Sequence, residues 1–115
     1  MNFESDKAKK AVKLYNKLVR DRIPEIIERS GAECKIRILS DKEYIEMIDA
    51  KLDEELAEYH KDKNLEELAD LLEVVRAAAL ARGYTLDELE ALRAAKAEER
   101  GGFTQKILLI ETAEK

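Results

Sequence analysis

The order of hydrophobic and polar positions predicts a chain that is mostly helical. A small polar residue followed three positions later by glutamate marks a helix start, because the two residues can cap each other's backbone N–H groups. This signal occurs three times, at Ser40 with Glu43, Asn64 with Glu67, and Thr85 with Glu88. It predicts helices over residues 41–59, 65–82 and 86–100. Gly83 and Gly101 follow the last two helices directly, where a left-handed residue commonly ends a helix.

Other segments predict a shorter helix, an N-terminal helix and a β element. Pro24 suits the first turn of a helix that ends before Gly31, and residues 6–15 predict a further helix. Residues 34–39, CKIRIL, alternate apolar and basic side chains with the period of a half-buried strand. Residues 107–111, ILLIE, form an apolar run that is consistent with a partner strand. The pattern therefore predicts an all-α, mainly helical bundle with a minor two-stranded β element.

Composition supports a single helical domain. A chain of 115 residues is long enough for one domain and too short for two. With 45% hydrophobic and 41% charged residues and few aromatics, it resembles a helical protein rather than a disordered or sandwich-like one. No apolar run suits a signal peptide or a membrane span, so we expect a cytoplasmic protein with no membrane partner. Cys34 is the single cysteine, which excludes an internal disulfide and a cysteine-based metal site.

The net charge of −5 conceals a strong division along the chain. Residues 7–22 contain seven basic side chains and one acid, whereas residues 41–73 contain thirteen acids and four lysines. Such asymmetry indicates an anionic partner for one region and a cationic partner for the other. A phosphorylated substrate that carries Mg²⁺ would satisfy both.

Two pairs of carboxylates fall on inward faces of the predicted helices. Residues three or four apart share a helix face. On this basis Glu55 and Glu58 border the core of the first long helix, while Glu67 and Asp70 begin an arc of the second that continues through valine and alanine. Both pairs have the spacing i, i+3, and the short turn between the helices makes them antiparallel neighbours. Four carboxylates can therefore converge between the two helices.

Two interpretations of this convergence are open. Carboxylate ligands without histidine or cysteine are typical of a hard cation, Mg²⁺ or Mn²⁺ rather than Zn²⁺. Alternatively, the acids form ion pairs with lysine or arginine from elsewhere, or are simply exposed at a helix start, where the dipole favours negative charge. The spacing alone does not decide between these interpretations.

The acidic segments also resemble a known family. EELAE (residues 54–58) and EELAD (residues 66–70) look like the ExxE and ExxD signatures of the all-α nucleoside triphosphate pyrophosphohydrolases, the MazG-like and phosphoribosyl-ATP pyrophosphohydrolase-like group. YNKLVRDRIPEII, from Tyr15, and ERGGF, near the end, are similar to members of the same group. The resemblance predicts one domain over residues 15–112, preceded by an extension over residues 1–14.

The resemblance implies roles for individual residues. The Mg²⁺ ligands would be the four acids that the helix faces selected: Glu55, Glu58, Glu67 and Asp70. Catalytic roles would fall to Glu55 and to Glu54, the latter as a water-activating carboxylate. One departure is that only eight residues separate Glu58 from Glu67, fewer than in many MazG domains, so the loop is tight and the nucleotide pocket is reshaped.

The implied reaction cleaves a nucleoside triphosphate between its α- and β-phosphates, giving a nucleoside monophosphate and pyrophosphate, as in the removal of non-canonical nucleotides. Basic side chains must stabilise the leaving pyrophosphate. Candidates are Lys96 and Arg100, one turn apart before two glycines, and the N-terminal Lys17, Arg20 and Arg22. The alternative for the first two is pairing with the helix dipole, and for the last three it is pairing with nearby acids.

The same acids and apolar surfaces are also compatible with other functions and with a homodimer. A phosphoribosyl-ATP pyrophosphohydrolase would use the same acids on another nucleotide, whereas a non-enzymatic helical dimerisation module would leave them solvated. Nucleic-acid binding is not expected, because Tyr15 is the single aromatic residue of the basic segment and the rest is acidic. The helices at 65–82 and 86–100 carry apolar surface on more than one side, which predicts a homodimer that covers it.

Overall fold

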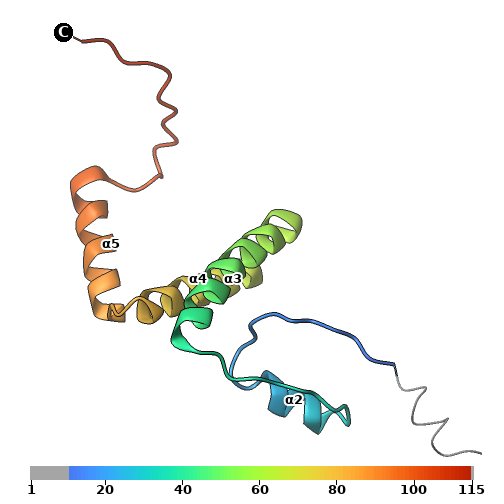
Figure 1. The fold of residues 1–115 in the computed structure, drawn as a ribbon. Coiled ribbons are helices and arrows are strands. Elements are labelled where there is room, and N and C mark those ends of the chain that lie inside the picture. Colours follow the sequence, from blue (N-terminus) through green and yellow to red (C-terminus); the bar gives the residue numbers. More distant parts are fainter. Residues whose placement is uncertain (1–10, 115) are drawn as a thin grey trace, which may run out of the picture. The chain divides into compact units, whose positions relative to one another are not determined.

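The computed structural model describes residues 11–114 of the chain. The chain divides into two units, residues 1–40 and residues 41–115, and each is described by itself. The described residues form four helices and no strand: α2 (Ile23–Arg29) in the first unit, and α3 (Asp41–Asp62), α4 (Leu65–Ala81) and α5 (Leu86–Arg100) in the second (Figure 1). The all-helical fold class is therefore confirmed for this part of the chain.

The predicted helix starts and stops have a clear basis in local hydrogen bonds. The Asn64 side chain accepts from the Glu67 backbone N–H at 2.9 Å, and Thr85 with Glu88 forms a complete capping box. At the end of α4, the N–H groups of Gly83 and Tyr84 donate to the carbonyls of Leu80 and Ala79, both at 3.0 Å. This Schellman arrangement needs a positive φ at Gly83, which has φ 88°.

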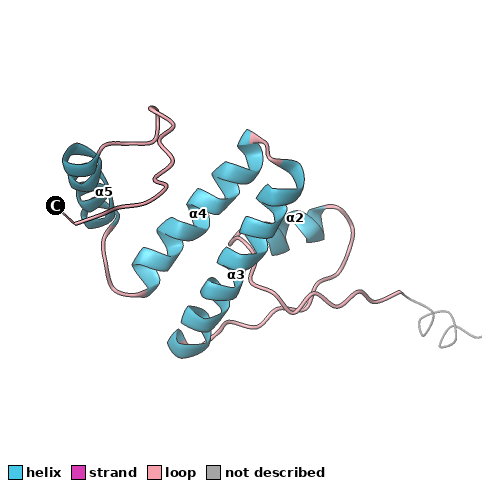
Figure 2. Cartoon of the chain, turned by 90° about the horizontal axis from the view of Figure 1, so that it is seen from above, coloured by secondary structure: helices cyan, strands magenta, loops and turns pink. Residues whose placement is uncertain are grey.

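α3 and α4 form an antiparallel hairpin (Figure 2). α3 runs three residues further than predicted, to Asp62, so that only Lys63 and Asn64 connect the helices. Lys63 adopts a left-handed φ of 50°, and its N–H donates to the Tyr59 carbonyl at 2.7 Å. The two-residue turn places the last turns of α3 beside the first turns of α4.

Little of the described part of the chain is buried. Among the described residues, only Ile48 on α3 and Val74 on α4 are classed as buried, with 3% and 8% of their surface exposed. α5 contacts α4 and makes no comparable contact with α3 in the described part. The hairpin therefore has a narrow core along one seam, and much apolar surface lies outside it.

The predicted two-stranded β element is wrong. Residues 34–39 and 107–111 form no strand, and most of their apolar side chains are exposed, including Ile38 at 86% and Ile110 at 86%. Alternation shows which side chains a strand would bury, but a strand also needs a pairing partner for its backbone groups. A lone two-stranded ribbon is at best marginally stable in water, so the apolar pattern alone does not form it.

The N-terminal predictions have mixed outcomes. Residues 11–15 of the predicted helix over residues 6–15 are not helical, and the remainder of that helix lies outside the described residues, as does most of the predicted extension over residues 1–14. The short helix begins at Ile23, with Pro24 in its first turn as predicted. The division after Ser40 falls inside the predicted domain over residues 15–112. None of the described helices combines the length and apolar character that crossing a membrane requires.

Candidate metal centre

The α3–α4 hairpin brings together three of the four predicted ligands. Glu55 on α3 and Glu67 and Asp70 on α4 each offer a carboxylate oxygen, and these three oxygens all lie within 4.8 Å of one another. All three residues are partly buried. The geometry arises because Glu67 and Asp70 lie one turn apart near the start of α4, while the tight turn places Glu55 opposite them.

A second group of acids shares Glu67 with the first. Oxygens of Glu58, Asp62 and Glu67 also lie within 4.8 Å of one another, with Glu58 and Asp62 exposed. The other three predicted ligands thus lie near Glu67. Glu55 and Asp70 belong to the first group, and Glu58 belongs to the second, more exposed group. We call the five residues of the two groups the acidic cluster: Glu55, Glu58, Asp62, Glu67 and Asp70.

Asp62 was missed by the sequence analysis. The predicted helix ended at Tyr59, which left Asp62 in a loop. Its signal was the spacing of four residues from Glu58, which places both acids on one face once α3 is continued to Asp62.

The carboxylates of the cluster act on one another electrostatically. The pKa of Glu67 is raised above its ordinary value, first by desolvation and then by the negative charges of Asp70, Asp62, Glu58 and Glu55. Ionised carboxylates that repel one another at partly desolvated positions favour either a proton or a cation among them. A set of carboxylate oxygens without nitrogen or sulfur fits Mg²⁺ or Mn²⁺.

Lys51, on α3, forms an ion pair with one residue of the cluster, Glu55. Lys51 Nζ lies 3.3 Å from an oxygen of Glu54 and 3.3 Å from an oxygen of Glu55. The exposed fractions of the side chains are 15% for Lys51, 30% for Glu54 and 12% for Glu55. Glu55 is thus paired with a lysine of its own helix, whereas the predicted ion pairs involved lysine or arginine from elsewhere. Sequence reasoning overlooked Lys51, whose spacing of three and four residues from the two glutamates was the available signal.

Glu54 lies beside the cluster and belongs to neither group of converging oxygens. Its carboxylate accepts a hydrogen bond from Lys51 at 3.3 Å. Its water-activating role stays a prediction, as does the catalytic role of Glu55.

The predicted substrate-binding cations are all exposed. Lys96 and Arg100 are exposed on α5, and within the described residues no ion pair joins either of them to an acid. Lys17, Arg20 and Arg22 are exposed in the first unit, where Arg22 pairs with Glu25 at 3.4 Å, as the alternative interpretation expected. The Lys17 ammonium lies 5.8 Å from the centre of the Tyr15 ring.

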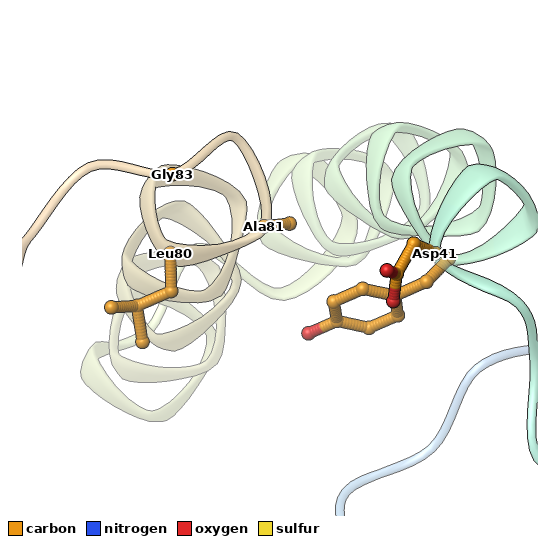
Figure 3. A pocket seen from close by; sticks show the side chains of 5 residues that line it. Asp41, Leu80, Ala81 and Gly83 are labelled. Carbon is orange, nitrogen blue, oxygen red and sulfur yellow. The ribbon is translucent and has the colours of Figure 1, made fainter.

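A shallow pocket of about 390 Å³ lies at the other end of the hairpin (Figure 3). Asp41 and Tyr44 from the start of α3 line it together with Leu80, Ala81 and Gly83 at the end of α4. No basic side chain lines this pocket, so it does not offer the positive charge that a phosphate group needs. The acidic cluster lies at the turn end of the same helices and shares no residue with this pocket.

Comparisons with known proteins give little further direction. No family model matches the chain, and no solved structure matches it. A protein of Mycolicibacterium smegmatis (strain ATCC 700084 / mc(2)155), described as uncharacterized, is 66% identical over 41 residues, which make up 36% of this chain and 42% of that protein. The match thus spans less than half the length of that relative, and its description specifies no activity.

Proposed function

We propose that this protein is a Mg²⁺-dependent nucleoside triphosphate pyrophosphohydrolase, which releases a nucleoside monophosphate and pyrophosphate. The observation that carries the proposal is the convergence of Glu55, Glu67 and Asp70 across the hairpin. These residues belong to the ExxE and ExxD segments that resemble the all-α nucleoside triphosphate pyrophosphohydrolases. Resemblance and geometry therefore favour the same part of the chain.

The donor set suits the proposed cofactor. Glu55, Glu67 and Asp70, with Glu58 beside them, would hold Mg²⁺, and Mn²⁺ could replace it because it accepts the same oxygen ligands. When bound, the ion would neutralise phosphate oxygens and lower the pKa of a coordinated water. Glu54, outside the converging groups but next to Glu55, would accept a proton from the attacking water. Lys96 and Arg100 are proposed to stabilise charge on the leaving pyrophosphate.

A homodimer is part of the proposal. Four side chains on α4, spaced at three, four and three residues, form one stripe on the solvent side of the helix, with exposed fractions from 37% to 81%: Leu65, Leu68, Leu72 and Val75. We call this the outer stripe of α4. A second copy would bury it, since an apolar row of this length rarely faces water in a stable protein. The second copy would also help to close the nucleotide pocket with its own basic residues.

A panel of canonical and modified nucleoside triphosphates, assayed for pyrophosphate release with and without Mg²⁺, tests the proposal. We expect metal-dependent release of pyrophosphate, and not of single phosphate, for at least one member. Turnover of phosphoribosyl-ATP alone would favour the rival enzyme instead. No turnover together with no stabilisation by Mg²⁺ would contradict the proposal and favour a non-enzymatic dimerisation module.

A further inference from the structure

Lys51 stands apart from the other lysines of the described residues, because all of those are exposed and Lys51 is not. Its ammonium reaches two carboxylates of its own helix, Glu54 at i+3 and Glu55 at i+4, at equal distances of 3.3 Å. Exposed ion pairs of this kind contribute little, because water and salt screen them. The side chains of Lys51 and Glu55 are only 15% and 12% exposed, so water screens this ion pair much less.

The two carboxylates that Lys51 bridges have different surroundings. Glu55 has an oxygen within 4.8 Å of Glu67 and Asp70, whereas Glu54 belongs to neither converging group. Lys51 therefore bridges one carboxylate of the inner converging group and one that belongs to neither group. A divalent cation among Glu55, Glu67 and Asp70 would be repelled by this ammonium and would compete with it for Glu55.

We propose that Lys51 is a positioning residue that acts as the internal counter-cation of the metal-free cluster and competes with the divalent cation for Glu55. This inference rests on the proposed function, since it concerns the same metal position. Without metal, the ammonium offsets part of the carboxylate repulsion and keeps Glu55 on the side of α3 that faces α4. When metal binds, Glu55 exchanges the ammonium for the ion, while Glu54 keeps Lys51 and so stays out of the ligand set.

The test compares Lys51→Met with the unaltered full chain by calorimetric titration with Mn²⁺ and by thermal unfolding in a chelator. Removing the ammonium takes away the competing positive charge, so Lys51→Met should bind Mn²⁺ about three- to tenfold more tightly. In chelator the same variant should unfold at a lower temperature, because the carboxylates have lost their counter-ion. Consequently, the rise in unfolding temperature on adding Mn²⁺ should be larger than for the unaltered chain.

Two further variants serve as controls. Lys42→Met removes the same charge from an exposed position on α3 and should leave both the Mn²⁺ affinity and the unfolding temperature nearly unchanged. Lys51→Arg keeps a cation within reach of both glutamates and should bind Mn²⁺ with nearly the original affinity. If Lys51→Met does not fold, Lys51→Gln, which keeps a polar end, should show the same tightening of Mn²⁺ binding.

The outcomes separate this inference from the proposed function. If the unaltered chain does not bind Mn²⁺, the proposed function fails and the competition fails with it. If the unaltered chain binds Mn²⁺ and neither Lys51→Met nor Lys51→Gln binds more tightly, the metal position stands and the role of Lys51 is overturned. Equal tightening by Lys42→Met would also overturn it, because the effect would then be one of net charge alone.

Discussion

Glu67 is the residue on which the acidic cluster depends, because both groups of converging oxygens include it. Its backbone N–H is held by the Asn64 cap, and its carboxylate lies among those of Glu55, Glu58, Asp62 and Asp70. Desolvation and these four charges raise its pKa. A residue in this position links the protonation state of the site, its metal affinity and the stability of the hairpin.

The first prediction concerns pH. Because the pKa of Glu67 is higher in the folded chain than the ordinary value of 4.5, the folded state holds this proton more firmly than the unfolded state does. Stability from this group is therefore greatest at low pH and is lost as pH rises from 4.5 through the raised folded pKa. Urea unfolding in chelator across this interval should show this loss in the unaltered chain but not in Glu67→Gln. Parallel pH profiles for the two proteins would contradict it.

A second residue-scale prediction concerns Asp70. Asp70→Asn removes one carboxylate from the inner group and should lower Mg²⁺-dependent turnover by more than about a hundredfold, since even groups that only support a ligand alter activity by 10- to 100-fold. Without metal, the variant should be as stable as the unaltered chain or more so, because carboxylate repulsion decreases. Pyrophosphate release and thermal unfolding measure the two effects. Near-normal activity would exclude Asp70 as a ligand.

Glu73→Gln is the matched control for Asp70→Asn. Glu73 lies one turn further along α4, is exposed, and belongs to neither converging group. Its substitution should leave both activity and stability nearly unchanged. A large loss of activity there would show that the inward face of α4 has been assigned incorrectly.

At the scale of elements, the turn between α3 and α4 decides whether the cluster forms. Lys63 takes a left-handed conformation and Asn64 caps the next helix, so the two helices reverse direction within two residues. Glu58 and Asp62 come from one side of this turn, while Glu67 comes from the other. The stability of the turn and the affinity for metal should therefore change together.

The third prediction tests this coupling through helix capping. Asn64→Ala should lower the free energy of unfolding by about 1 kcal/mol, because the Glu67 N–H loses its acceptor. It should also weaken Mn²⁺ binding, because the cap helps to set the position of Glu67. Chemical denaturation and calorimetric titration measure the two quantities.

Thr85→Ala is the control for this third prediction. It removes a comparable cap at the start of α5, which supplies no residue to the cluster. We expect a similar loss of stability and no change in Mn²⁺ affinity. Equal weakening of metal binding by both variants would indicate general destabilisation rather than positioning by the turn.

At the scale of the whole molecule, the described part of the chain exposes much apolar surface and has a small core. Ile48 and Val74 are the buried apolar residues of the described part, whereas the outer stripe of α4 faces solvent. Further along the second unit, Phe103 is 97% exposed and residues 107–110 are between 75% and 86% exposed. Burying such surface in a second copy would supply the hydrophobic stabilisation that the narrow seam between α3 and α4 lacks.

The fourth prediction concerns assembly. Leu72→Glu places a charge in the middle of the outer stripe, where the exposed fraction of the leucine is 58%. Light scattering at micromolar concentration should give the mass of a dimer for the unaltered chain and that of a monomer for the variant, with a loss of activity. Ile38→Glu alters an exposed apolar residue of the first unit, which is not part of the stripe, and should keep the dimer. A monomer mass with full activity for the unaltered chain would refute both the dimer and the shared pocket.

The sequence by itself determined where the three long helices begin and on which faces Glu55, Glu67 and Asp70 lie. Asn64 and Thr85 mark helix starts because a cap acts on N–H groups within three residues, and Gly83 marks a stop for an equally local reason. Glu55, Glu67 and Asp70 could be assigned to partly buried faces because helical periodicity is also local, whereas Glu58, assigned to the same flank as Glu55, is exposed. Such features need no knowledge of what lies across the fold.

Only the tertiary structure decided how these local elements meet. It extended α3 to Asp62, closed the turn with Lys63 and Asn64, and so added Asp62 to the cluster and Lys51 to Glu54 and Glu55. It also left residues 34–39 and 107–111 without strand pairing, although their patterns suited strands. A strand, a half-buried ion pair and a converging cluster each depend on a partner surface distant in sequence, and that surface exists only once the chain has folded.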